Sequence, residues 1–330
     1  PQEIKKLFDF LKKLRTEGKG LIYISHRMEE IFELSNTILV LRDGKSVQYS
    51  ETKQTTSNQL IHAMVGRTLD RLFPAKPQLR KTEKTKSLLK VDGLSGTNAL
   101  GKMLFGPLSF DLEAGEILGF SGLLGSKRTE SMKGLLGDTK IKVKGSVSIN
   151  GEPVFIKNPR QGLEKNVVYL SEDRKGESIM ARRSLLEKLS LMRLSKEPLF
   201  SLIDNKREKA QALTSLQMLR TRCTGPEQEI RNLSGGNQQK VVIGRALQAD
   251  PKIMILDEPT RGVDVGAKYE IYEILLELAQ KGMGLILISS DLPELLHLCD
   301  RILVLSQGQQ KGLLRADEFS DTQIMKLAVL

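Results

Sequence analysis

The chain has 330 residues, and its 51 lysines and arginines against 40 aspartates and glutamates give a formal net charge of +11. Apolar residues make up 39% and charged residues 28%, a balance that predicts a folded globular chain and excludes a disordered one. No apolar stretch approaches the roughly 18 residues that span a bilayer. The two cysteines and three scattered histidines show no metal-ligand spacing. The length allows about two domains.

The excess positive charge is mostly spread along the chain. Its densest run falls in residues 73–86, a proline-containing stretch that predicts a solvated linker. Aromatic side chains, which stack on the bases of single-stranded nucleic acids, are not interleaved with these cations. The run therefore does not predict a nucleic-acid partner. Its members are Lys76, Arg80, Lys81, Lys84 and Lys86.

An internal repeat is the most informative feature of the sequence. The segment 20–30 returns at 284–294, an offset of 264 residues (284 minus 20), and the match continues without a gap to 38–41 and 302–305. In both copies an amphipathic helical pattern precedes the repeat, which opens on a short apolar run typical of a buried strand. The chain therefore holds two copies of one module.

The two copies differ in extent. With the same offset, residue 1 corresponds to Val265, so we expect the first copy to be the C-terminal remnant of its module, with a strand edge at residues 21–24 that lacks its native partners. The second copy shows the features of a complete module. The predicted parts are the remnant over residues 1–72, the linker over residues 73–86 and the full module over residues 87–330.

The second copy alternates short apolar strands with helices. Such alternation predicts an α/β fold with a largely parallel sheet. The expected strands lie at residues 87–91, 115–120, 145–149, 167–169 and 252–256, and the expected helices at residues 129–136 and 236–247, followed by the repeated helix and strand.

One of these strands ends in two adjacent carboxylates. Asp257 and Glu258 follow the apolar residues 252–256, which places them at the strand end where parallel α/β sheets bind ligands. Asp257 can hold Mg²⁺, directly or through water, and Glu258 can orient or deprotonate an attacking water. An acidic loop after a buried strand is the simpler alternative.

A glycine-rich loop lies between the strand at 115–120 and the helix at 129–136. Phosphate-binding loops need glycines for a tight turn, then a cation and a hydroxyl for Mg²⁺. The strict pattern GxxxxGK[ST] is broken, because Lys127 stands at its last glycine and Arg128 at its lysine. An ordinary strand-to-helix turn is the alternative. The candidate nucleotide-binding residues are Gly122, Gly125, Ser126, Lys127, Arg128, Thr129 and Glu130, and the candidate metal ligands are Thr129 and Asp257.

The segment 233–240 carries a third motif. Ser234 is a typical helix N-cap, and the two glycines after it leave their N–H groups open to an anion. Ser234 lies 23 residues before Asp257 (257 minus 234), with the glycine-rich loop further upstream, which favours a functional motif over a lone helix cap. The candidate residues are Ser234, Gly235, Gly236, Asn237 and Gln238.

Together these motifs resemble the ATP-binding subunits of ABC transporters. Residues 233–238 are similar to the signature motif, the strand with two carboxylates to Walker B, and the loop at 122–129 to Walker A. Within that superfamily, residues 171–175 and 258–264 resemble the second half of the tandem ATPases of bacterial monosaccharide importers. The resemblance implies a P-loop NTPase fold with ATP and Mg²⁺ as ligands. It also implies integral-membrane permease subunits, an extracytoplasmic sugar-binding protein, and a peripheral position on the cytoplasmic face of the bacterial inner membrane.

The resemblance assigns roles to further residues. Asp264 matches the D-loop, and Ser171 or Glu172 takes the position of the Q-loop glutamine. Members of the family carry a switch histidine beside the γ-phosphate, which the first copy keeps as His26 and the second replaces with Ser290. We therefore expect a degenerate nucleotide site in the second module.

Three more expectations follow from the resemblance. Glu258 and His26 are the catalytic candidates, and Phe105 is a candidate platform for adenine. The family holds ATP between the Walker loops of one module and the signature of another, so the modules of the tandem chain are expected to form such a dimer. The signature at residues 234–238 would then serve the site to which His26 belongs.

Two other functions remain open on the sequence. A non-hydrolysing regulatory ABC module, or an orphan truncated product, is favoured by the broken phosphate loop and the incomplete first copy. A nucleic-acid-associated ABC ATPase would fit the positive charge. It is disfavoured by the short linker and by the lack of a coiled-coil insert between the Walker A loop and the signature.

Overall fold

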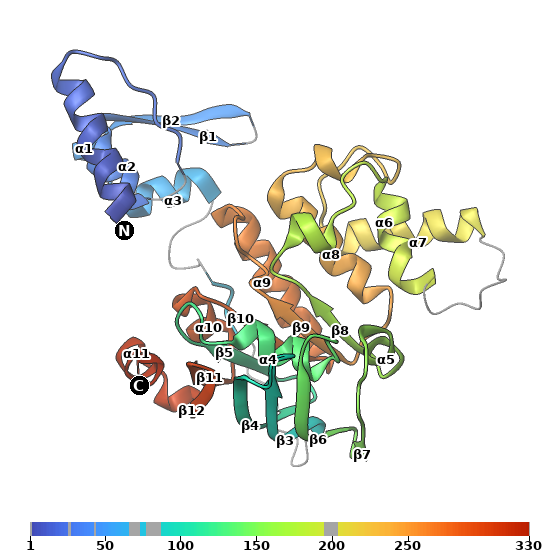
Figure 1. Cartoon of the computed structure of the whole chain (residues 1–330). Helices are drawn as coiled ribbons and strands as arrows, with labels where there is room; N and C mark the ends of the chain where they lie inside the picture. The colour runs from blue at the N-terminus through green and yellow to red at the C-terminus, as the bar shows by residue number, and fades with distance from the viewer. Residues whose placement is uncertain are drawn as a thin grey trace. The chain divides into compact units, whose positions relative to one another are not determined.

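A computed structural model describes residues 2–25, 28–42, 44–65, 73–76, 87–194 and 204–329. The chain divides into two compact units, Pro1–Pro74 with Asp264–Tyr269, and Ala75–Val263 with Glu270–Leu330 (Figure 1). Across the described residues, no helix is both long enough and apolar enough to span a membrane. The predicted linker is described only at residues 73–76.

The described part of the first unit combines helices with one hairpin. β1 and β2 pair antiparallel. Ile38 and Val40 alternate along β1 and are buried in a small core with Leu60 of α3, because successive residues of a strand point to opposite faces. The elements are α1 (Gln2–Thr16), α2 (Met28–Leu34), β1 (Thr37–Arg42), β2 (Lys45–Glu51), a helical turn (Thr52–Gln54) and α3 (Ser57–Val65).

The expected strand at residues 21–24 is not formed. Residues 19–25 have neither helix nor strand structure, and Ile22 and Ile24 are 96% and 93% exposed. In the second copy the corresponding strand, β10 (Gly284–Ile288), hydrogen bonds to a strand on each side. The described part of the first unit contributes one hairpin to strand pairing, so residues 21–24 have no parallel neighbour there.

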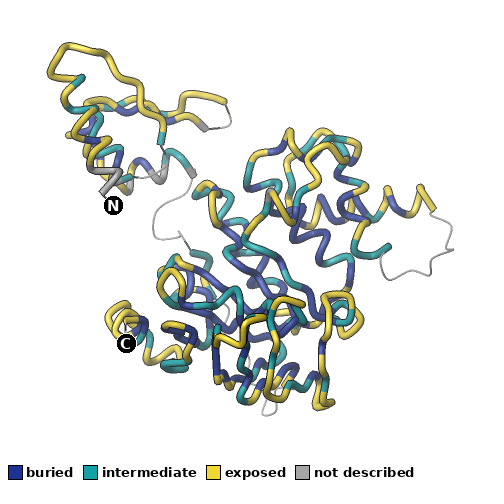
Figure 2. The backbone as a smooth tube through the Cα atoms, viewed as in Figure 1, coloured by how far each residue is buried: buried dark blue, intermediate teal, exposed yellow. Residues whose placement is uncertain are grey.

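The second unit is built on a six-stranded sheet with the order β12-β11-β5-β10-β9-β8. Five strands run parallel, and β12 pairs antiparallel with β11 at one edge. The inner strands β5, β9 and β10 are buried along their whole length, as the dark blue of Figure 2 shows. The predicted α/β fold with a largely parallel sheet is therefore confirmed. The other bounds are β5 (Ile117–Ser121), β8 (Val167–Leu170), β9 (Ile253–Asp257), β11 (Arg301–Ser306) and β12 (Gln309–Arg315).

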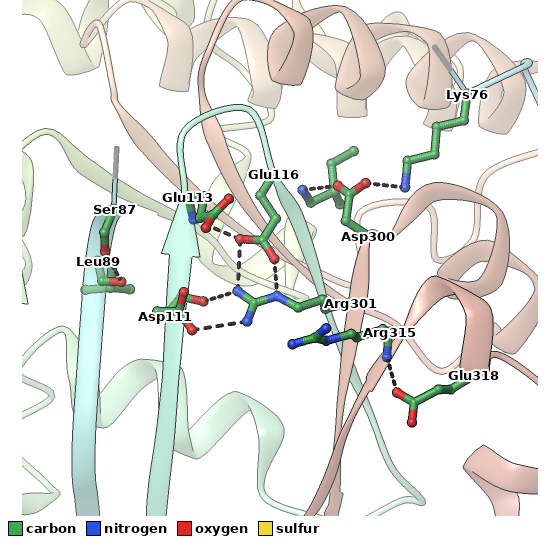
Figure 3. Close-up of polar contacts among 11 residues, drawn as sticks. Lys76, Ser87, Leu89, Asp111, Glu113, Glu116, Asp300, Arg301, Arg315 and Glu318 are labelled. Atoms are coloured by element: carbon green, nitrogen blue, oxygen red, sulfur yellow. Dashed lines mark hydrogen bonds and ion pairs between the residues drawn. The ribbon is translucent and has the colours of Figure 1, made fainter. Parts of the chain in front are cut away.

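A second, antiparallel sheet with the order β4-β3-β6-β7 was not anticipated from the sequence. Arg301 of β11 ties it to the central sheet: its Nε donates to Oε1 of Glu116 at 2.6 Å, and its guanidinium also donates to Oδ1 of Asp111 at 3.1 Å (Figure 3). Beside this cluster, Lys76 pairs with Asp300 at 2.7 Å. The strands are β3 (Ser87–Thr97), β4 (Met103–Glu113), β6 (Lys142–Ile149) and β7 (Glu152–Pro153).

The helices of the second unit fall into groups. α6, α7 and α8 pack around a small core that includes Leu185, Leu216 and Val241, and Figure 1 shows them at the opposite end of the unit from β3, β4 and β6. The helices are α4 (Arg128–Leu135), α5 (Pro159–Glu164), α6 (Leu185–Leu194), α7 (Asn205–Met218), α8 (Gly235–Leu247), α9 (Val265–Gln280), α10 (Leu292–Leu298) and α11 (Asp321–Val329), with helical turns at Arg174–Ser178, Ile230–Asn232 and Ala316–Glu318.

Candidate functional site

The glycine-rich loop connects buried strand β5 to helix α4. Gly122 and Gly125 have φ angles of +154° and +83°. A Cβ atom on Gly122 would lie 2.4 Å from the carbonyl oxygen of Leu305, so a side chain does not fit there. Both glycines therefore have the conformational role that a tight loop before a helix requires.

Lys127, which replaces the last glycine of the strict phosphate-loop pattern, keeps a glycine-like backbone. Its φ is +71° and its ψ is +24°, the left-handed region, at the N-cap of α4. Such a conformation costs a residue with a Cβ atom about 1 kcal/mol or more. The Lys127 ammonium donates to Oε1 of Glu130 at 2.8 Å. The cation is thus engaged by an acid one turn into its own helix.

Arg128 extends from α4 to the ends of two central strands. Its guanidinium donates to the carbonyl oxygen of Ser289, which follows β10, at 2.6 Å, and lies 4.0 Å from Oε1 of Glu258, which follows β9. Burial lowers the pKa of Arg128, and the negative charges of Glu258 and Asp257 oppose that shift. An arginine remains charged in such surroundings, so it supplies a fixed cation beside the loop.

Asp257 and Thr129 form the part of the site that fits a divalent cation. The Thr129 hydroxyl donates to Oδ2 of Asp257 at 2.7 Å. Oδ1 of Asp257 is buried and has no hydrogen-bond partner among the described residues. A hydroxyl and a carboxylate are oxygen ligands of the kind that Mg²⁺ prefers. Thr129 and Asp257 would hold Mg²⁺ here, and the ion would neutralise phosphate charge.

Glu258 sits beside this pair in a strained backbone. Its φ is +48°, and its Oε2 accepts a hydrogen bond from the Ser290 hydroxyl at 3.1 Å. Burial raises the pKa of the Glu258 and Asp257 carboxyls, and hydrogen bonds from Ser290 and Thr129 respectively offset part of that rise. A carboxylate with a raised pKa, close to a cation, is suited to accept a proton from water. Ser290, predicted at the switch position, is thus in contact with the candidate base.

Strand β8 and the loop that follows it contact other parts of the candidate site. Tyr169, the third residue of β8, donates to Oδ2 of Asp257 at 2.8 Å. Glu172 pairs with Arg261, and Arg174 donates to the carbonyl oxygen of Gly235 at 2.9 Å. The sequence predicts only that Tyr169 ends a strand, and the contacts of Tyr169 and Arg174 were not anticipated from it. Alternation along β8 could have indicated the direction of Tyr169, but not its partner.

The signature forms the N-terminus of α8. The Ser234 hydroxyl, which is exposed, accepts from the backbone N–H of Asn237 at 3.5 Å and from its side-chain amide at 3.0 Å. Gln238 donates to the carbonyl oxygens of Ile230 and Leu233. Within the described residues, no hydrogen bond or ion pair joins Ser234 to the glycine-rich loop. The Ser234 end of the motif is therefore exposed, and it is not joined to the glycine-rich loop within this unit.

Three further predicted residues have different outcomes. Asp264 accepts from the backbone N–H of Ala267 at 3.0 Å, as a helix N-cap does. His26 lies outside the described residues. Phe105 is 1% exposed and belongs to the main core of the second unit, the buried cluster that includes Phe120, Met132 and Ile255. The expectation that Phe105 offers a platform for adenine is therefore wrong, because its ring is enclosed by the core.

Comparison with known proteins identifies a family for the middle of the chain. Residues 105–261 match the family model described as ABC transporter. Residues 105–261 therefore form a domain of the ABC transporter family. Two solved ATP-binding cassettes of ABC transporters, one nucleotide-free and one in an ADP conformation, align with TM-scores of 0.63 and 0.62 at 22% identity. They cover 73% and 74% of this chain and 98% and 99% of theirs. At that identity the likeness shows the fold, an ABC-type P-loop NTPase.

The sequence relatives are sugar-import proteins. The chain is 43% identical over 328 residues to the ribose import ATP-binding protein RbsA of Clostridium tetani, and 42% identical over 327 residues to the xylose import ATP-binding protein XylG of Geobacillus kaustophilus. The alignments cover 99% of this chain, but 63% and 64% of those relatives. The chain therefore spans less than two thirds of the length of the relatives that it matches.

Proposed function

We propose that the chain is part of the energy-coupling ATPase of a sugar-type ABC importer. The observation that carries the proposal is the grouping of Asp257 and Glu258, at the end of β9, with Arg128 and Thr129, at the start of α4. The loop before α4 has two glycines with positive φ angles. This arrangement supplies a cation that can bind phosphate, a site for Mg²⁺ and a base that can accept a proton from water. The names of the relatives support ribose or xylose as the class of cargo.

The partners follow from that proposal. The protein would act from the cytoplasmic face of the bacterial inner membrane as a peripheral subunit, bound to integral-membrane permease subunits. An extracytoplasmic sugar-binding protein would deliver the cargo to the permease. Nucleic acid is not among the proposed partners, since the positive charge is dispersed and lacks interleaved aromatic residues.

We further propose that the first unit is completed in the working protein by a second set of Walker loops. Its exposed Ile22 and Leu39 correspond to Ile286 and Leu303, which are fully buried in the core of the second unit. A segment like residues 87–264 would cover the first pair as the second pair is covered. The two modules would then form a nucleotide-binding dimer within one tandem chain.

The two sites of such a dimer would do unequal work. The signature at residues 234–238 retains its serine and both glycines and would clamp the ATP of the first module, beside His26. The second site has Lys127 in place of a glycine, and its Arg128 is held by Ser289 and Glu258. We infer that the first site hydrolyses most ATP. The second site mainly binds nucleotide, which is also what a non-hydrolysing regulatory module would do.

The test is sugar uptake by the full-length tandem protein, assembled with its permease in vesicles at saturating Mg²⁺-ATP. Loss of one oriented contact to a charged transition state commonly costs about 10²–10³ in rate. Ser234→Arg and His26→Ala should each nearly abolish uptake, and Arg128→Ala should leave a substantial fraction. Arg160→Ala, an exposed arginine on α5, is the matched control. If Arg128→Ala is as damaging as Ser234→Arg, the proposed asymmetry is wrong.

A further inference from the structure

The two carboxylate oxygens of Asp257 have unequal surroundings. Oδ2 accepts two hydrogen bonds, from the Thr129 hydroxyl at 2.7 Å and from the Tyr169 hydroxyl at 2.8 Å. Oδ1 is buried without a hydrogen-bond partner among the described residues, and Asp257 as a whole is 2% exposed. A buried carboxylate oxygen without a partner is costly, so this oxygen is the one that a cation or its bound water would satisfy.

The position of Tyr169 follows from the sheet. β8 and β9 are parallel neighbours, and Tyr169 lies opposite Ile255. Because side chains alternate along a strand, Tyr169 shares a face of the sheet with Ile255 and with Asp257, two residues further along β9. Its ring packs against the main core. Packing against the core thus fixes the ring of Tyr169 in an orientation that places its hydroxyl within hydrogen-bond distance of Asp257.

The Tyr169 hydroxyl acts as a donor. A phenol, with an ordinary pKa of about 10, keeps its proton at physiological pH, so the Tyr169 hydroxyl donates a hydrogen bond to Oδ2 of Asp257. A hydrogen bond to an ionised carboxylate is stronger and more directional than one between neutral groups.

We propose that Tyr169 is a positioning residue for the divalent cation of this site. With Thr129, it holds Oδ2 of Asp257 and so leaves Oδ1 as the oxygen available to Mg²⁺ or to a Mg²⁺-bound water. Thr129 has a second task, because its hydroxyl oxygen is itself a candidate ligand. Tyr169 has no such task, and its contribution to the carboxylate can be removed alone. This inference rests on the proposed nucleotide site.

A purely structural tyrosine makes a different prediction. If the hydroxyl only stabilises the sheet, Tyr169→Phe lowers the stability of the unit and changes nucleotide affinity equally with and without Mg²⁺. If it orients Asp257, the variant weakens only the part of nucleotide binding that depends on Mg²⁺. Partners that orient a metal ligand commonly contribute about 10–100-fold to metal affinity.

The experiment titrates ADP into the whole chain by calorimetry, in EDTA and at a series of Mg²⁺ concentrations. We expect Tyr169→Phe to need about tenfold more Mg²⁺ for half of the Mg²⁺-dependent gain in ADP affinity. In EDTA its ADP affinity should stay within about twofold of wild type. Tyr272→Phe is the matched control, because Tyr272 is also a buried tyrosine of the second unit, on α9. It should leave the Mg²⁺ dependence unchanged.

Other outcomes overturn the inference. Equal loss of affinity with and without Mg²⁺, or the same shift in Tyr272→Phe, would assign Tyr169 a structural role. A wild-type chain that binds ADP equally well in EDTA and in Mg²⁺ would show that Asp257 positions no metal. A wild-type chain that binds no ADP would overturn the proposed nucleotide site itself, and with it the role of Tyr169.

Discussion

Two segments of nearly the same sequence adopt different structures in this protein. Residues 20–24 and 284–288 differ only at Tyr23 and Leu287. The second segment is the fully buried strand β10, and the first is exposed and irregular. The difference lies in the neighbours: β5 and β9 bond to both edges of β10. An apolar run specifies a parallel strand only where other strands complete its hydrogen bonds.

The hairpins of the two copies behave in the opposite way. β1–β2 and β11–β12 both form, and both shift register at equivalent places, between Val40 and Leu41 and between Val304 and Leu305. An antiparallel hairpin satisfies its hydrogen bonds within a few residues of chain, so it forms in both copies. Among the described residues of the first unit, local strand pairing is therefore present and long-range strand pairing is not.

Hydrogen exchange offers the largest test of this comparison. The amides of β10 are bonded on both sides in the centre of a buried sheet and should exchange only on opening of the second unit. Those of residues 20–24 should exchange at least about 10³-fold faster. Mass spectrometry of the intact, monomeric chain measures both segments at once. Comparable protection in both segments would refute the difference.

Truncation of two equivalent isoleucines, one buried and one exposed, tests the same difference. Ile286→Ala removes a side chain that is 0% exposed and should cost the second unit about 2–5 kcal/mol of unfolding free energy. Ile22→Ala, at the equivalent position, should cost less than about 0.5 kcal/mol. Urea denaturation followed by circular dichroism measures each variant. In a complete tandem protein we expect Ile22→Ala to become costly, and an unchanged small effect there would contradict the proposed covering of the first unit.

The second unit contains a buried lysine, which makes the stability of that unit depend on pH. Lys188 of α6 is 2% exposed, and burial, then the nearby charge of Arg245, lower its pKa to about 8 from an ordinary 10.5. Between these values the unfolded chain binds more protons, so wild-type stability rises with pH there. Lys188→Met should therefore stabilise the second unit at pH 7 by up to about 3 kcal/mol. That gain should shrink as pH rises from about 8 towards 10.5.

Urea unfolding at pH 7 and pH 10 measures that gain. Lys13→Met, at an exposed position on α1 of the first unit, is the control. It should leave the free energy of unfolding unchanged at both pH values. A gain that stays constant across this pH range would show that the benefit comes from packing of the methionine rather than from relief of a buried charge.

The sequence predicted what depends on local pattern. The strands before the glycine-rich loop and before Asp257 and the helix after Ser234 lie within a few residues of their expected bounds. The sequence failed where contacts with distant residues determine the structure. Residues 20–24 have the pattern of a strand but do not form one, and Phe105, a candidate to stack on adenine, is enclosed by the packing of the core. The contact of Tyr169 with Asp257 depends on β8 and β9 being neighbours, and strand order is not written in either segment.

The smallest expected effect concerns the switch position, where the first copy has His26 and the second has Ser290. The hydrogen bond from Ser290 lowers the pKa of Glu258, against the larger opposing effect of burial. Ser290→Ala should therefore raise that pKa. If Glu258 is the base, a higher pKa keeps it protonated to a higher pH. The acidic limb of the ATPase pH profile should therefore shift to higher pH.

The measurement is steady-state ATP hydrolysis by this chain across the acidic and neutral range, at Mg²⁺-ATP concentrations that saturate each variant. Wild-type turnover is expected to be slow, because Lys127 and Arg128 alter the phosphate loop and Ser290 cannot replace the histidine contact. Glu258→Gln is the reference, since it should remove the limb altogether. A limb that persists in Glu258→Gln belongs to another group. If the acidic limb of Ser290→Ala stays at the wild-type pH, the serine does not tune the pKa of Glu258. The two copies would then differ at this position only in that the second lacks the histidine.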